Sequence, residues 1–165
     1  MIGVYPSLQD RNPSPSTARL LADLVPPREF ERASFENYIP HSEFPSQAEA
    51  SKAAQSFALG KTAKRGLFSR GPVETDSLGI YLDGGFGVGK THLLAATYHQ
   101  FRGKKAFGSF IAFTSLIGAL GFAAAKEALA RYALICIDEF ELDDPGDTMI
   151  MSRLLNELGA RGVKF

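Results

Sequence analysis

Hydrophobic positions in the second half of the chain follow two alternating patterns, which predict strands separated by helices. Three short apolar runs predict buried strands: residues 78–82, 106–113 and 132–138. Three longer segments with helical spacing lie between and after them: residues 90–101, 115–131 and 145–158. Strands that alternate with helices form a parallel sheet with helices on its faces. We therefore predict an α/β fold in which helices sandwich a parallel sheet.

The first third of the chain has a different pattern, in which prolines separate short helices. Residues 17–25 predict a helix that stops at Pro26. Ser46 and Glu49 fit a capping box, in which each side chain bonds the free backbone amide of the other residue. The alanine-rich helix that they open is expected to end at Gly60. This region is predicted to be a short, mostly helical segment that precedes the sheet.

A polar and basic stretch at residues 60–77 separates this segment from the core and predicts a solvated loop. We place the boundary there, so that residues 1–75 form the N-terminal segment and residues 76–165 form the core. The core ends with Gly162 and an apolar run to Phe165, which predict the first residues of one more strand. We therefore expect an incomplete sheet, in a chain that is the N-terminal part of a longer protein.

Composition excludes several classes of protein. The 165 residues include 45% hydrophobic residues, which is enough for one core. Eighteen lysines and arginines balance 18 aspartates and glutamates, so the net charge of zero provides no general attraction for nucleic acid. Cys136 is the one cysteine, which excludes a secreted disulfide scaffold. The N-terminus lacks a secretory signal pattern, and we expect a cytoplasmic protein.

A glycine-rich stretch links the first predicted strand of the core to its helix and matches the pattern G-x-x-x-x-G-K-T. Glycines let the backbone curl around an anion with its amides pointing inward, and the helix start adds free amides and a positive dipole end. Lys90 is suited to reach the β- and γ-phosphates, and the Thr91 hydroxyl to coordinate magnesium. The predicted nucleotide contacts are consecutive: Gly84, Gly85, Phe86, Gly87, Val88, Gly89, Lys90, Thr91 and His92.

Two other readings of this part of the chain are disfavoured. The dinucleotide fingerprint G-x-G-x-x-G does not fit, because the spacing differs and the stretch ends in lysine, which argues against a Rossmann dehydrogenase. His92 and His99 lie seven residues apart on one helix face, but without a nearby third ligand they make a weak metal site.

Two adjacent acids mark the end of the predicted strand 132–138: Asp138 is its last residue, and Glu139 follows it. Because the carboxyl ends of parallel strands meet at one edge of the sheet, we expect Asp138 to lie near Lys90 and Thr91. Asp138 is suited to support magnesium, and Glu139 to orient and deprotonate the attacking water. We therefore predict magnesium-dependent hydrolysis of ATP, with Glu139 and Lys90 as catalytic residues and Thr91 and Asp138 at the metal.

The same pairing excludes a membrane span. Residues 106–125 carry no charge and are numerous enough to cross a bilayer. A crossing there would place Lys90 and Asp138 on opposite sides of about 30 Å of lipid, and one ATP molecule cannot bridge that distance.

These motifs resemble those of AAA+ ATPases, and more narrowly those of the ZapE cell-division ATPases and their mitochondrial AFG-like relatives. The resemblance also rests on F-E-N-Y-I-P at residues 35–40, on F-P-S-Q at 44–47 where the family has Y-P-S-Q, and on D-E-F-E-L-D-D at 138–144. In such ATPases the segment before the first helix lies against the adenine. The resemblance therefore implies base contacts for Tyr38, Ile39 and Pro40; the alternative is that Tyr38 simply packs against the N-terminal helices.

The resemblance further implies a P-loop NTPase of the AAA+ type that acts in bacterial cell division on the tubulin-like polymer FtsZ. It implies a homo-oligomer when the protein is full length, with at most peripheral membrane association. Family members continue into a sensor strand and an arginine finger, which do not occur before Phe165. Two alternatives stay open: an ATP-dependent loader or scaffold related to helicase loaders, and a nucleotide-binding fragment with little activity.

Overall fold

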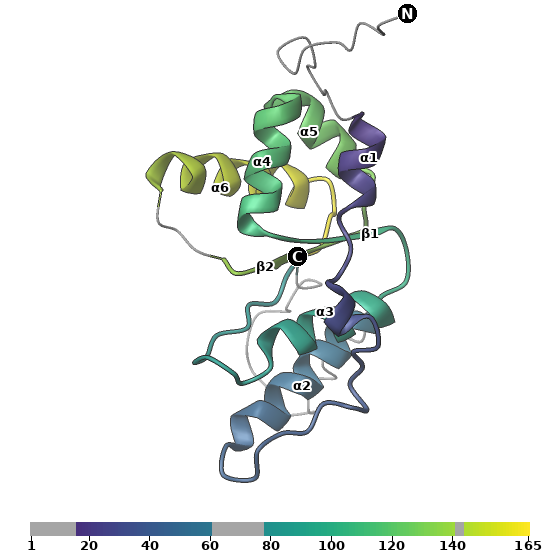
Figure 1. Cartoon of the computed structure of the whole chain (residues 1–165), viewed down its shortest axis with the longest axis vertical. Coiled ribbons are helices and arrows are strands. Elements are labelled where there is room, and N and C mark those ends of the chain that lie inside the picture. Colours follow the sequence, from purple (N-terminus) through teal and green to yellow (C-terminus); the bar gives the residue numbers. More distant parts are fainter. Residues whose placement is uncertain (1–15, 61–77, 141–143) are drawn as a thin grey trace, which may run out of the picture.

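The computed structural model describes residues 16–60, 78–140 and 144–165, which fold into an α/β arrangement (Figure 1). Two parallel strands lie at its centre: β1 (Lys105–Ser109) and β2 (Leu134–Asp138). One face of this pair carries four helices: α1 (Thr17–Ala22), α4 (Phe110–Leu120), α5 (Phe122–Leu129) and α6 (Pro145–Gly159). The other face carries the 3-10 helix η2 (Arg28–Phe30), α2 (Pro45–Ala58) and α3 (Lys90–Gln100). The expected α/β class is therefore confirmed, with a small parallel sheet.

The backbone pairing continues beyond these two strands. Lys164 forms a parallel bridge with Leu134, and its amide donates to the Ala133 carbonyl at 3.0 Å. Phe165 then pairs with the segment before the glycine-rich stretch: its amide donates to the Leu78 carbonyl at 2.9 Å, and its carbonyl accepts from Ile80 at 3.0 Å. The order across the sheet is thus β1, β2, the residues around Lys164, and the residues around Gly79.

The predicted strand at residues 78–82 is wrong as an element, although these residues do pair with the rest of the sheet through Phe165. A regular strand needs a ladder of hydrogen bonds along its length. Residues 78–82 instead share one pair of backbone hydrogen bonds with Phe165 and form no regular strand.

Side chains of β1 and β2 alternate between two separate cores. Ala106 and Ile135 pack into the cluster beneath α4, α5 and α6, whereas Phe107, Leu134 and Cys136 pack against α3. Both faces of the strands are covered, which explains why residues 134–137 are apolar without interruption. Cys136 is 2% exposed, and burial raises the pKa of its thiol to about 12, so it is a small buried hydrophobe as expected.

Two element boundaries differ from the prediction for physical reasons. The expected strand 106–113 stops at Ser109, because the Ser109 hydroxyl accepts a hydrogen bond from the Ala112 amide at 3.2 Å and caps α4. Phe110 and Phe113 are then buried at helical spacing. The expected helix 115–131 is divided at Gly121, whose φ of 77° interrupts the helical conformation between α4 and α5.

The N-terminal helices also begin and end differently. The predicted helix 17–25 ends at Ala22. The capping box of Ser46 and Glu49 is wrong: α2 begins at Pro45, its N-cap is Phe44, and no side chain caps it. Pro45 has its φ preset for the first helical position, which places Ser46 inside the first turn. The basic stretch at residues 61–77 lies outside the described residues.

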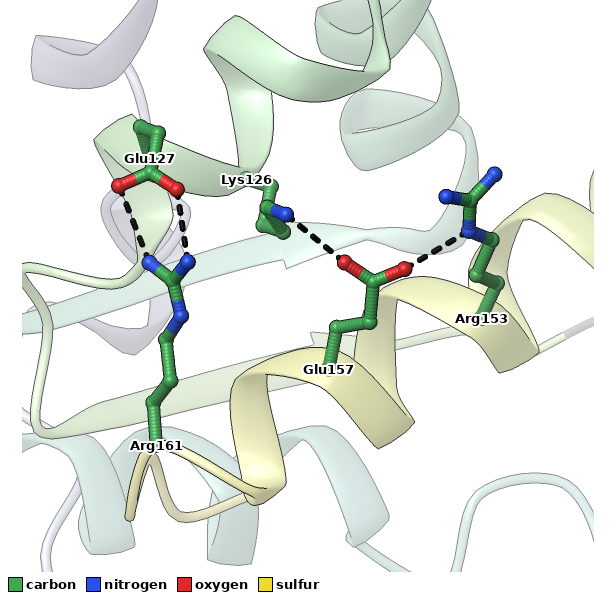
Figure 2. Close-up of polar contacts among 5 residues, drawn as sticks. All are labelled: Lys126, Glu127, Arg153, Glu157 and Arg161. Carbon is green, nitrogen blue, oxygen red and sulfur yellow. Dashed lines mark hydrogen bonds and ion pairs between the residues drawn. The ribbon is translucent and has the colours of Figure 1, made fainter.

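Two ion pairs join α5 to α6 and the residues that follow it, and a third ion pair lies within α6 (Figure 2). Glu157 accepts from Lys126 at 2.9 Å and from Arg153 at 2.7 Å, while Arg161 donates to both oxygens of Glu127 at 3.0 and 2.8 Å. These hydrogen bonds lower the pKa of Glu157 and Glu127 below the ordinary 4.5. Their stabilising effect is therefore complete above pH 4.5 and is lost as the pH falls through the lowered pKa values.

No helix in the described parts of the chain combines the length and the apolar character that a membrane crossing requires. The uncharged residues 106–125 are divided among β1, α4 and α5 instead.

The close approach of Gly79 to Phe165 generates a stability prediction. A Cβ at Gly79 lies 2.9 Å from the Phe165 carbonyl oxygen, which cannot shift without disturbing its bond to Ile80. We expect Gly79→Ala to lower the free energy of unfolding by about 1–3 kcal/mol in urea denaturation. The matched control is Gly118→Ala on α4, where nothing lies within 4 Å. There we expect a gain of about 0.5–1 kcal/mol from helix propensity; equal effects of the two variants contradict the sheet order.

Candidate functional site

The glycine-rich stretch forms a loop that leads directly into α3. Gly84, Gly87 and Gly89 have φ values of 151°, 74° and 88°, which side-chain-bearing residues rarely adopt. Gly89 is also the N-cap of α3. A Cβ there lies 2.6 Å from a ring carbon of Tyr38, so glycine is required at this position by both conformation and space.

Lys90 bridges the two ends of this loop. Its ammonium group donates to the carbonyls of Gly84 and Gly85, each at 2.7 Å. Two charge-assisted hydrogen bonds hold the loop closed around the lysine head group. At the loop entrance, the Asp83 carboxylate accepts from the Gly84 amide at 2.8 Å. The loop thus holds a fixed positive charge next to the N-terminal end of a helix, a combination that attracts anions.

A direct hydrogen bond connects the start of α3 with the end of β2. The Thr91 hydroxyl donates to a carboxylate oxygen of Asp138 at 3.1 Å, although 47 residues separate them in sequence. The two residues meet because β2 ends at Asp138 on the same edge of the sheet at which α3 begins. The structure therefore brings the glycine-rich loop and the acidic strand end together, as the sequence predicted. The metal roles of Thr91 and Asp138 stay predictions.

Glu139 follows β2 with an unusual backbone. Its φ of 50° is the one positive value among the non-glycine residues that the structure describes. For an L-residue this left-handed conformation costs roughly 1–2 kcal/mol. The next residue, Phe140, is anchored by packing: its ring lies edge-on to the Phe110 ring, with 5.3 Å between the ring centroids. Glu139 itself is exposed to solvent beside Asp138, so its carboxylate is free to meet a water molecule.

Tyr38 touches the loop from outside. Its hydroxyl donates to the Val88 carbonyl at 2.8 Å, and the centroid of its ring lies 5.6 Å from that of the His92 ring. Burial raises the pKa of Tyr38 above 10.0, so the phenol stays protonated and donates at neutral pH. Ile39 is 88% exposed and Pro40 is half-buried. Base contacts by Tyr38, Ile39 and Pro40 stay a prediction.

The two histidines of α3 both bind the N-terminal segment. Nε2 of His92 lies 3.0 Å from the Ser34 carbonyl, and Nε2 of His99 lies 3.0 Å from the Phe30 carbonyl. A carbonyl oxygen only accepts, so Nε2 carries the proton in each ring. Sequence reasoning missed these contacts, although the seven-residue spacing already placed both rings on one helix face.

Two further residues of the loop, Gly85 and Phe86, are open to solvent. Phe86 is fully exposed at the loop, and Gly85 has open space around it. Among residues 16–60, 78–140 and 144–165, no group of three His, Cys, Asp or Glu side chains could hold a metal ion. The phosphate contacts expected from residues 84–92 stay predictions.

A glycine-rich loop at a helix start, close to a carboxylate at the end of a parallel strand, is the arrangement of nucleotide-binding α/β proteins. The family model of the AFG1-like ATPases matches residues 14–165, and the chain belongs to this family. ATPase activity is thus supported at the level of the family. No curated protein and no solved structure matches the chain.

Substitutions of two loop glycines should have different effects. Gly89→Ala forces a positive φ on alanine and pushes its Cβ into Tyr38, so we expect ATP affinity to fall at least tenfold in equilibrium titration. Gly85→Ala is the matched control, because its Cβ meets no atom within 4 Å, and we expect a smaller loss. Equal losses contradict the assignment of a conformational role to Gly89.

Proposed function

We propose that this protein binds ATP together with magnesium and hydrolyses it. The observation that carries the proposal is the hydrogen bond of 3.1 Å between the Thr91 hydroxyl and the Asp138 carboxylate. It joins the phosphate-binding loop to the acidic strand end, and this junction is where P-loop NTPases hold the metal and the terminal phosphates.

The oxygen donors of this junction fit magnesium. A hydroxyl and a carboxylate are hard ligands, and Mg²⁺ binds proteins through one or two such oxygens while keeping water and phosphate as further ligands. Thr91 would hold the ion directly and Asp138 would support it through the water shell. When bound, magnesium neutralises charge on the β- and γ-phosphate oxygens.

Lys90 supplies the positive charge of the site. In the structure its ammonium donates to the Gly84 and Gly85 carbonyls. We expect it to exchange these neutral acceptors for β- and γ-phosphate oxygens, since hydrogen bonds between two charged groups are stronger than those to a carbonyl. The loop amides and the α3 dipole complete the phosphate contacts.

Glu139 is proposed as the general base. It lies next to Asp138 at the end of β2, exposed to solvent and held in a left-handed conformation. From there its carboxylate would orient a water molecule and accept its proton as the water oxygen attacks the γ-phosphorus and ADP leaves. Strain at a residue next to a metal-supporting carboxylate is typical of functional positions.

The test is a comparison of ATP binding and hydrolysis in wild-type protein and the Glu139→Gln variant. The amide keeps the shape of the side chain but cannot accept a proton, so we expect ATP affinity within about threefold of wild type and hydrolysis slower by about 10²-fold or more. Single-turnover assays with magnesium measure both quantities.

Two outcomes of this comparison contradict the proposal in different ways. A wild-type chain that binds no ATP overturns the nucleotide assignment as a whole. A wild-type chain that binds ATP without turnover favours the loader or scaffold alternative, or a fragment with little activity. Lys90→Ala serves as the binding-deficient control, because it removes the charge that faces the phosphates.

We also propose that the protein acts in the cytoplasm, as a homo-oligomer when full length, on the division polymer FtsZ. The support is the resemblance to ZapE through residues 35–40 and 138–144. We expect the protein to co-sediment with FtsZ polymers more in the presence of magnesium and ATP than in their absence. Sedimentation that is unchanged by FtsZ contradicts the partner and leaves the ATPase proposal intact.

A further inference from the structure

Tyr38 approaches one peptide unit of the phosphate loop in two ways. Its hydroxyl donates to the Val88 carbonyl at 2.8 Å. Its ring carbons occupy the space at Gly89 where a Cβ would project, at 2.6 and 3.4 Å from that position. The peptide between Val88 and Gly89 is therefore held on its carbonyl side by a residue 50 positions earlier in the chain.

Because the peptide bond is planar, this contact also determines the direction of the neighbouring amide group. In a trans peptide the C=O and N–H bonds lie in one plane and point in opposite directions. A donor on the Val88 carbonyl therefore fixes the direction of the Gly89 amide, which points away from Tyr38. Gly89 has no Cβ, so its backbone has many accessible conformations, and without such a contact the plane would rotate more freely.

Tyr38 is itself held by α3. Its ring packs against His92 at 5.6 Å, and His92 donates to the Ser34 carbonyl at 3.0 Å. Asn37 closes a turn on the same segment, since its side-chain oxygen accepts from the Ser34 amide at 2.8 Å. The tyrosine is thus presented to the loop by an ordered segment.

We propose that Tyr38 is a positioning residue of the phosphate loop, which holds the Val88–Gly89 peptide so that the Gly89 amide is presented to the polyphosphate. The inference rests on the proposed function, because it concerns how the same site binds ATP. It differs from the base contact that the resemblance implies, since Tyr38 acts here on the phosphate side and through the backbone.

The experiment compares the binding of ATP and of inorganic tripolyphosphate, which has no base, to wild type and Tyr38→Phe. Removing one hydroxyl leaves the ring and its packing in place. We expect Tyr38→Phe to weaken the binding of both ligands by the same factor, about two- to tenfold, as one hydrogen bond allows. We also expect the amide resonance of Gly89 to shift in the ligand-free variant, which reports the changed orientation of the peptide.

The matched control is Tyr98→Phe. Tyr98 lies on α3, and its ring packs edge-on against Phe107, but its hydroxyl makes no hydrogen bond to the part of the chain that the structure describes. This variant should leave both affinities and the Gly89 resonance unchanged. The thermal unfolding midpoint of each variant shows whether the fold is kept.

The outcomes separate this inference from the proposed function. Loss of ATP affinity with unchanged tripolyphosphate affinity overturns positioning and supports a base contact. Unchanged affinity for both ligands overturns the inference alone. A wild-type chain that binds neither ligand overturns the proposed function, and the inference with it.

Discussion

The parallel register between β1 and β2 is the constraint on which the rest of the structure depends. It pairs Ser109 with Asp138 at one edge of the sheet, and it buries Phe107 and Cys136 on one face and Ala106 and Ile135 on the other. A parallel strand requires a crossover, and helices α4 and α5 supply it while covering one face. Because the chain then returns to the same edge, the carboxylate of Asp138 reaches the first turn of α3.

The glycine-rich loop before α3 is held by side-chain hydrogen bonds to its backbone carbonyls. Lys90 donates to the carbonyls of Gly84 and Gly85, and the Tyr38 hydroxyl donates to the carbonyl of Val88. Glycine is essential to this arrangement at position 89, where φ is positive and the tyrosine ring occupies the space of a side chain. The N-terminal segment is therefore part of the site as well as of the core, since His92 ties it to the helix that begins at Lys90.

The errors of prediction arise where one local pattern is compatible with more than one structure. Phe110 and Phe113 fit a buried strand as well as a helix, because a short apolar run does not distinguish the two; the Ser109 cap decides for the helix. Ser46 and Glu49 have the spacing of a capping box, but Pro45 starts the helix two residues earlier than that box requires. Residues 78–82 have strand composition, and their pairing depends on Phe165, which lies far away in sequence.

Sequence alone determined the type and order of the main elements, and the location of the two motifs on them. The glycine spacing, the lysine and threonine after it, and the acids after an apolar run are local patterns whose chemistry can be read directly. Only the tertiary structure decided that Thr91 contacts Asp138, that Tyr38 bonds the loop carbonyl, and that two histidines bind backbone oxygens of the N-terminal segment. These contacts join residues 47 to 69 positions apart, and their geometry follows from how helices pack on the sheet, which no local pattern encodes.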